Sequence, residues 1–219
     1  SFQDAETIYL NNPTDGQART VSYALDAMKN NVDQPVTVGT CDSGVLYNHK
    51  SLNTTLEQNK YDLLVWVMKG YKGALENPEM YGWVKTDLEN NIIELSVKKV
   101  LDDPVKDNVI LGIFTFRNKN ILANCLNSLF RRGEKINDEF YLDSVIDDAL
   151  ELGLSCKVFE VENFLCWGTP NDLKTFNYWQ SCFHIWNSHP YSIDKDKKFN
   201  QNKTDEIIKK IYSWNPNKE

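Results

Sequence analysis

The chain has 219 residues, of which 41% are hydrophobic and 25% charged, a composition typical of one large globular domain. Lys and Arg number 24 against 31 Asp and Glu, so the net charge of −7 argues against a broad nucleic-acid-binding face. No apolar run approaches the ~18 residues that a membrane helix needs. We therefore expect a globular protein without a nucleic-acid or membrane partner.

The first third of the chain predicts alternating strands and a helix. Short β-type runs at 6–10 and 35–40 flank residues 17–30, in which apolar side chains recur at helical spacing. Strand, helix and strand in this order predict a βαβ unit. A helix near 50–59 and a dense β-type run at 62–68 follow.

The rest of the chain changes this pattern. The runs at 80–86, 92–100 and 109–116 predict consecutive, partly antiparallel strands. Thr169, Pro170 and Asp172 are typical of a helix start, which predicts a helix to about Trp186. The remaining predicted elements are helices at 119–131 and 141–152, a strand at 154–161 and a short run at 163–167. This order predicts a three-layer α/β domain with a mixed sheet in residues 1–186, and a peripheral tail at 187–219 that could hold a helix at 204–213.

Five cysteines are odd in number, lie far apart and form no CxxC pair: Cys41, Cys125, Cys156, Cys166 and Cys182. We expect reduced thiols and a cytoplasmic location.

Several short motifs, in order over roughly residues 10–180, resemble the sugar-phosphate nucleotidyltransferases. These enzymes join a nucleoside triphosphate to a phosphorylated sugar or similar alcohol and release pyrophosphate. Val36–Asp42 resembles the strand that ends in the family's magnesium-binding aspartate, and such sheets bind ligands beyond the carboxyl ends of their strands. The resemblance implies that Asp42 holds Mg²⁺. It also implies a nucleotide-binding set made of Gly16, Gln17, Ala18 and Cys41.

The resemblance extends to the side that binds the phosphorylated acceptor. Residues 80–84, 92–100 and 111–114 resemble the family's acceptor segments, in which Lys98 would meet the acceptor phosphate. Val97 and Lys99 stand where the family usually has Glu and Pro. The remaining residues that the resemblance assigns to the acceptor are Tyr81, Gly82, Glu139, Asp143 and Trp167.

Two departures from the family are informative. Cys166 stands where many relatives have a second metal-binding aspartate, and sulfur is a poor ligand for magnesium. The family's glycine-rich turn with Arg and Lys, which cradles the triphosphate, is absent from these residues. We therefore expect the C-terminal two-thirds of a Rossmann-like, GT-A-like nucleotidyltransferase domain whose N-terminal part is missing.

Two alternatives stay open. A glycosyltransferase of GT-A type usually has Asp-x-Asp at this strand end, whereas Cys41-Asp42-Ser43 supplies one carboxylate. A non-catalytic relative that binds a nucleotide or sugar is favoured by the absent turn and by Cys166. The retained Asp42 and Lys98 count against it.

Overall fold

The computed structural model describes residues 5–28, 33–99, 101, 103–185 and 195. They belong to two compact units, one of Ser1–Cys41 with Val45–Phe164 and one of Asp42–Gly44 with Leu165–Glu219. The predicted tail at 187–219, with its helix, lies outside the described residues except for Lys195. No helix in the described ranges is long and apolar enough to cross a bilayer.

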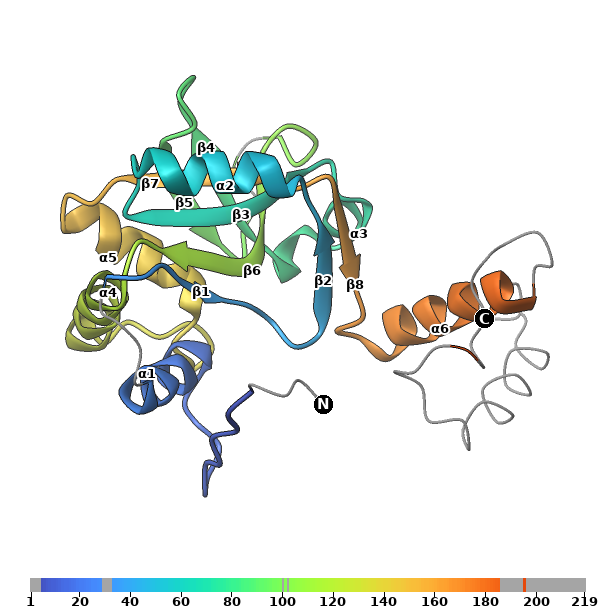
Figure 1. Cartoon of the computed structure of the whole chain (residues 1–219), viewed down its shortest axis with the longest axis horizontal. Coiled ribbons are helices and arrows are strands. Elements are labelled where there is room, and N and C mark those ends of the chain that lie inside the picture. The colour runs from blue at the N-terminus through green and yellow to red at the C-terminus, as the bar shows by residue number, and fades with distance from the viewer. Residues whose placement is uncertain (1–4, 29–32, 100, 102, 186–194, 196–219) are drawn as a thin grey trace. The chain divides into compact units, whose positions relative to one another are not determined.

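The first unit is built on a mixed sheet of six strands (Figure 1). The order is β5-β4-β6-β3-β7, and β1 pairs with β6. Strand β3 is parallel to β7, and the other pairs are antiparallel. The bounds are β1 (Val36–Val38), β3 (Leu63–Lys69), β4 (Gly82–Thr86), β5 (Ile92–Val97), β6 (Asn108–Phe116) and β7 (Cys156–Glu160). The predicted α/β class with a mixed sheet is confirmed.

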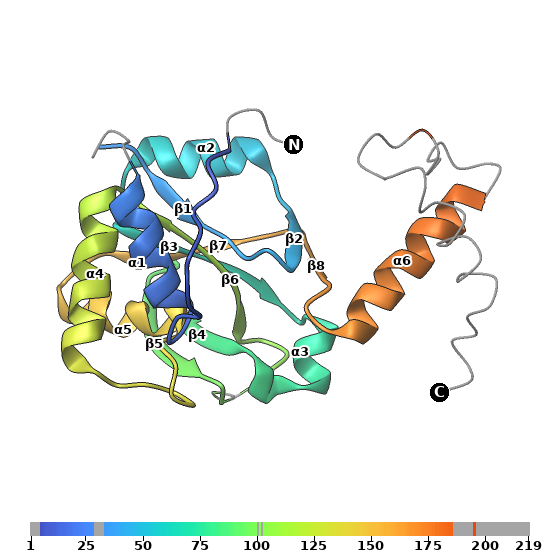
Figure 2. The same cartoon turned by 90° about the horizontal axis from the view of Figure 1, so that it is seen from below.

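Helices cover both faces of this sheet (Figures 1 and 2). The helices α1 (Gln17–Ala27), α4 (Lys119–Arg132) and α5 (Val145–Glu151) lie on one face, and α2 (His49–Gln58) lies on the other. Along β3, Leu63 and Val65 enter the first core cluster, whereas Leu64 and Trp66 enter the second. Because β3 is buried on both faces from Leu63 to Val67, its sequence is an unbroken apolar run up to Met68.

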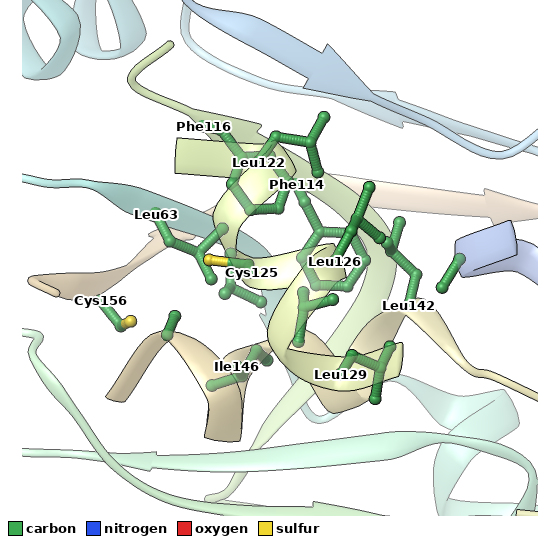
Figure 3. Close-up of a cluster of buried hydrophobic side chains, with 14 of the residues drawn as sticks. Leu63, Phe114, Phe116, Leu122, Cys125, Leu126, Leu129, Leu142, Ile146 and Cys156 are labelled. Carbon is green, nitrogen blue, oxygen red and sulfur yellow. The ribbon is translucent and has the colours of Figure 1, made fainter. Parts of the chain in front are cut away.

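The larger core lies between the sheet and α4 and α5 (Figure 3). Phe114 and Phe116 of β6 pack there with Leu122, Leu126 and Leu129 of α4. Cys125 and Cys156 lie in the same core, where burial raises the pKa of both thiols to about 12. They are protonated packing residues, and all five cysteines are free as expected.

Most predicted elements are observed within a few residues of their expected ends, but the predicted strand at 6–10 is wrong. This segment forms no strand, and Tyr9 is 88% exposed. A strand needs a neighbour to satisfy its backbone, and none among the described strands pairs with these residues. The predicted βαβ unit is therefore wrong as well. The short connecting helices are α3 (Lys72–Glu76), η1 (Pro78–Met80) and η2 (Leu142–Ser144).

Candidate active site

The predicted nucleotide turn lies against the segment that leads into η2. Gly16 precedes α1 with φ 121°, and a Cβ there would lie 2.5 Å from the backbone N and O of Phe140. The Ala18 N–H donates to the Phe140 carbonyl at 3.1 Å, and the Phe140 N–H donates to the Asp15 carbonyl at 2.8 Å. Glycine is therefore required here by its backbone angle and by this close approach. The fold thus joins the predicted nucleotide turn to the predicted acceptor segment.

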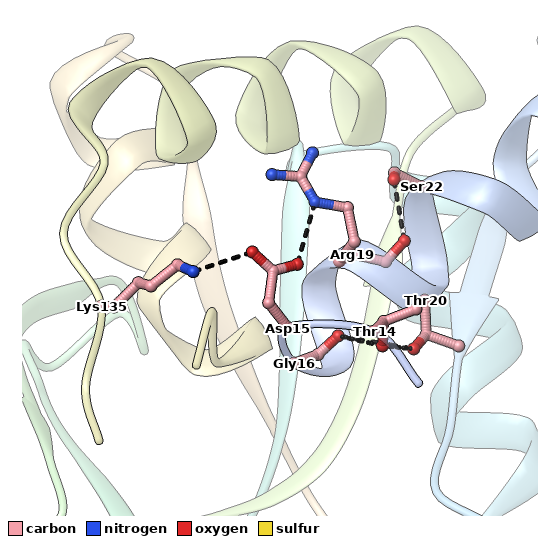
Figure 4. Close-up of polar contacts among 7 residues, drawn as sticks. All are labelled: Thr14, Asp15, Gly16, Arg19, Thr20, Ser22 and Lys135. Carbon is pink, nitrogen blue, oxygen red and sulfur yellow. Dashed lines mark hydrogen bonds and ion pairs between the residues drawn. The ribbon is translucent and has the colours of Figure 1, made fainter. Parts of the chain in front are cut away.

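Polar contacts hold this turn in place (Figure 4). The Asp15 carboxylate accepts from Arg19 Nε at 3.2 Å and pairs with Lys135 Nζ at 2.9 Å. The bond with Lys135 is the main reason why the pKa of Asp15 lies below its usual value. Thr14 Oγ1 donates to the carbonyl oxygen of Gly16. The start of α1 is thereby fastened to the segment that follows α4.

The three residues of the turn differ in what they offer a ligand. Ala18 is fully buried, so its side chain belongs to the core, whereas Gln17 is exposed. A cavity of about 510 Å³ opens beside α1 and is lined by Asp15, Arg19 and other residues, not by Gly16, Gln17 or Ala18. The Gln17 side chain is thus the exposed group that this turn offers to a ligand, because the Ala18 N–H and the Gly16 carbonyl already have hydrogen-bond partners.

Three of the predicted acceptor residues meet in the first unit. Gly82 begins β4, and a Cβ on it would lie 2.5 Å from Asp143 Oδ2. Lys98 follows β5, and its backbone N–H donates to the Tyr81 carbonyl at 3.1 Å. The Lys98 ammonium donates to the carbonyl oxygen of Met80. The lysine therefore comes from the residue after β5, the aspartate from η2 and the glycine from the start of β4.

The Asp143 carboxyl titrates in an unusual range. Burial raises its pKa to about 6, and the positive charge of Lys98 opposes this rise. Two further predicted acceptor residues, Tyr81 and Glu139, belong to the same unit. The Tyr81 ring packs edge-on against Tyr71 at 5.8 Å, and Glu139 has an exposed side chain.

Tyr141 is a member of this cluster that the sequence motifs did not indicate. The Lys98 ammonium lies 5.3 Å from the centre of its ring, within the range of a cation–π interaction. The one available signal was its position between Glu139 and Asp143 in the same segment.

The second unit contains Asp42 and Trp167. Asp42 is exposed, and its carbonyl accepts from the Trp167 N–H at 3.0 Å. A Cβ on Gly168 would lie 2.9 Å from Asp42 Oδ2, and a Cβ on Gly44 would lie 3.0 Å from the Trp167 ring. The two glycines therefore allow the carboxylate and the indole to lie against the backbone. Asp42 directly precedes β2 (Ser43–Leu46), Trp167 directly follows β8 (Asn163–Cys166), and these two strands form a two-stranded sheet.

Of the possible metal ligands near Asp42 among the described residues of the second unit, only the Asp42 carboxylate is free to bind a cation. Asp172, at the start of α6 (Pro170–Ile185), accepts from the Thr169 N–H at 3.2 Å and the Thr169 hydroxyl at 2.7 Å. The predicted helix cap is thus confirmed. The Asp172 carboxylate is engaged in these hydrogen bonds and is not free to bind a metal ion. Burial raises the pKa of the Cys166 thiol, so this sulfur stays protonated. In the described part of the chain, no group of three or more His, Cys, Asp or Glu could hold a metal. These residues fit Mg²⁺ only if phosphate and water complete its coordination.

Three solved structures share this architecture. The inositol-1-phosphate CTP transferase from T. maritima matches with a TM-score of 0.53 and 16% identity over 72% of this chain and 58% of that one.

The fold is that of sugar-phosphate nucleotidyltransferases.

Two further solved structures share the same fold. A nucleoside-diphosphate-sugar pyrophosphorylase from Vibrio cholerae RC9 has a TM-score of 0.54 and 17% identity over 76% of this chain and 66% of that one. A Bacillus anthracis protein, assigned as a glucose-1-phosphate thymidylyltransferase and solved with a sucrose, has a TM-score of 0.57 and 14% identity over 77% and 62%. The chain thus spans about three fifths of the length of such structures. No protein-family model and no curated protein matches the chain.

Proposed function

We propose that this chain is the larger part of a nucleotidyltransferase that acts on a phosphorylated sugar or a similar phosphorylated alcohol. An acceptor phosphate oxygen attacks the α-phosphorus of a nucleoside triphosphate, and pyrophosphate leaves. The observation that carries this proposal is the meeting of Lys98, Asp143 and Gly82, which lie far apart in the sequence. The shared fold supports the reaction type. Biosynthesis of nucleotide sugars for cell-surface polysaccharides, in the cytoplasm, is the setting that we propose.

The acceptor would bind on the first unit. Lys98 would place its charge at the acceptor phosphate, and Asp143, Glu139, Tyr81 and Gly82 would frame the remainder. A positioned ammonium stabilises a phosphate dianion without forming a covalent bond, so catalysis here consists of orientation and charge neutralisation.

The nucleotide would bind at the turn that precedes α1 and at the residues after β1. The backbone of Gly16 and Ala18 would lie against the base, with Gln17 and Cys41 beside it. Within the second unit, Asp42 would hold Mg²⁺ together with phosphate oxygens, and Trp167, whose N–H donates to the Asp42 carbonyl, would contact the substrate. When bound, the ion would neutralise phosphate charge.

Activity in this proposal also needs the glycine-rich turn that cradles the triphosphate, supplied from outside these 219 residues. Two features support this idea. Among the described strands, β1 has a partner on one edge only, namely β6. Ile8, Tyr9 and Leu10 are exposed apolar residues that form no strand. Unpaired edges and exposed apolar residues are typical of surfaces that another segment covers.

The decisive experiment is exchange of labelled pyrophosphate into each nucleoside triphosphate by the complete protein. We expect exchange, and Asp42→Ala should lower turnover by at least ~100-fold, the scale of a lost electrostatic stabiliser. Asp172→Asn is the matched control and should keep turnover, because Asp172 has a structural role at a helix start. Transfer from a nucleotide sugar without exchange would favour a glycosyltransferase. Nucleotide binding without pyrophosphate release would favour a non-catalytic relative.

A further inference from the structure

Lys98 has a backbone conformation that its side chain does not favour. Five described residues other than glycine have positive φ angles: Asn59, Asn90, Lys98, Asn137 and Asp138. Four of them are Asn or Asp, whose short polar side chains tolerate the left-handed region. Lys98, at φ 60°, is the exception. The chain therefore keeps a strained residue at a position where Asn or Gly would turn the backbone at lower cost.

Local structure requires a turn here but gives no reason for a lysine. The last residue of β5, Val97, pairs with Gly82, and the Lys98 N–H still donates to the Tyr81 carbonyl before the chain leaves the sheet. The next residue, Lys99, is exposed and has no positive φ. A proline at 99, as in the family pattern, would disfavour helical conformations at Lys98, and the N–H-bearing Lys99 imposes no such restriction.

Two contacts define the position of the Lys98 ammonium. One of its three N–H groups donates to the Met80 carbonyl, and the ring of Tyr141 lies 5.3 Å away. The ammonium donates no other hydrogen bond to a described residue, so its other two N–H groups are available to an anion. Asp143 is an acidic group whose titration the Lys98 charge affects, and Glu139 precedes Tyr141 on the same segment.

We propose that Lys98 is held in its strained conformation because this conformation aims the ammonium at a bound phosphate, and that Tyr141 is the positioning residue that keeps it there. The identity of that phosphate, as the acceptor's, rests on the proposed function.

The strain is tested without any ligand. Lys98→Gly and Lys98→Ala both remove the ammonium, but only glycine adopts the left-handed region without penalty. We expect Lys98→Gly to melt about 2–4 °C above Lys98→Ala. The matched pair, Lys99→Gly and Lys99→Ala, should show no such advantage for glycine. A glycine variant at 98 that melts no higher than the alanine variant would overturn the claim of strain.

The role of Tyr141 is tested with inorganic phosphate as the probe. In the complete protein, phosphate binding is followed by NMR of isotope-labelled lysine side chains. Tyr141→Leu should weaken binding about threefold or more, and Tyr141→Phe, which keeps the ring face, should restore it. Lys98→Ala should abolish the response, whereas Lys99→Ala, a matched loss of charge, should keep it.

A kinetic measurement separates this inference from the proposed function. Where pyrophosphate exchange is found, Tyr141→Leu should raise the acceptor KM severalfold and change kcat less than twofold. Phosphate binding that depends on Lys98 and Tyr141 in a protein without exchange would refute the proposed function and leave the inference standing. Exchange with phosphate binding and KM unchanged in Tyr141→Leu would refute the inference alone.

Discussion

Asp143 shows how one partly buried side chain links the candidate site to the stability of the fold. Burial raises its pKa to about 6 from the value of 3.8 expected for an exposed aspartate. At pH values between these two pKa values, Asp143 keeps its proton in the folded protein but has released it in the unfolded chain. The stabilisation from the neutral carboxyl is therefore complete below about pH 4 and is lost as the pH rises through about 6.

Asp143→Asn removes this titration, and we expect the variant to gain stability relative to the natural protein as the pH rises. Its melting temperature, minus that of the natural protein, should be higher at pH 7.5 than at pH 4.5 by at least about 2 °C. Thermal unfolding over a pH series measures the difference. Glu139→Gln, on an exposed side chain, serves as the control and should show no such trend. A constant difference for Asp143→Asn would contradict the raised pKa.

The sequence motifs indicated three residues that lie close together in the folded chain. Lys98, Gly82 and Asp143 were singled out by resemblance, and the fold brings them together. Tyr141 was missed because a tyrosine between Phe140 and Leu142 is typical of a packing residue. The roles of all these residues in binding stay predictions.

At the scale of single elements, the start of α6 shows how a carboxylate can be used for structure. The Asp172 N–H donates to Thr169 Oγ1 at 3.1 Å, and the Asp172 carboxylate accepts from Thr169 in return. We expect Asp172→Ala to destabilise this helix start by ~1 kcal/mol. Hydrogen exchange in the first turn of α6 measures the effect, with Asn171→Ala as the control. A raised Mg²⁺ requirement with unchanged exchange would show that Asp172 binds metal instead.

The predicted elements that were found have local causes, and the one that was not depends on a neighbour. Helix α4 begins after Asn118, whose side chain accepts from the Ile121 N–H, and ends before Gly133, which has φ 73°. Both signals lie in the sequence. The run at 6–10 has strand-like composition too, but β structure needs a partner strand, which composition alone cannot supply. Local composition therefore located the strands of the sheet but could not show that residues 6–10 have no partner among the described strands.

At the scale of the whole molecule, β1 has a partner strand on one edge only among the described residues. Val36–Val38 pair with Phe114–Phe116 along one edge. We expect backbone amides of Val36–Val38 that do not bond to β6 to exchange quickly in the 219-residue chain and to be protected in the complete protein. Hydrogen exchange followed by mass spectrometry compares the two. Equal exchange in both would contradict the proposed missing segment.

The contact between Gly16 and Phe140 has a mechanical consequence. Two backbone hydrogen bonds, one on each side of Gly16, fasten residues 15–18 to the segment that carries Tyr141 and Asp143. Because glycine has no side chain to separate them, the backbone at Gly16 directly contacts the backbone at Phe140, and we expect the two segments to move together. Under the proposed function, a ligand that binds to one of these segments would therefore affect binding at the other, and the effect would be equal in both directions.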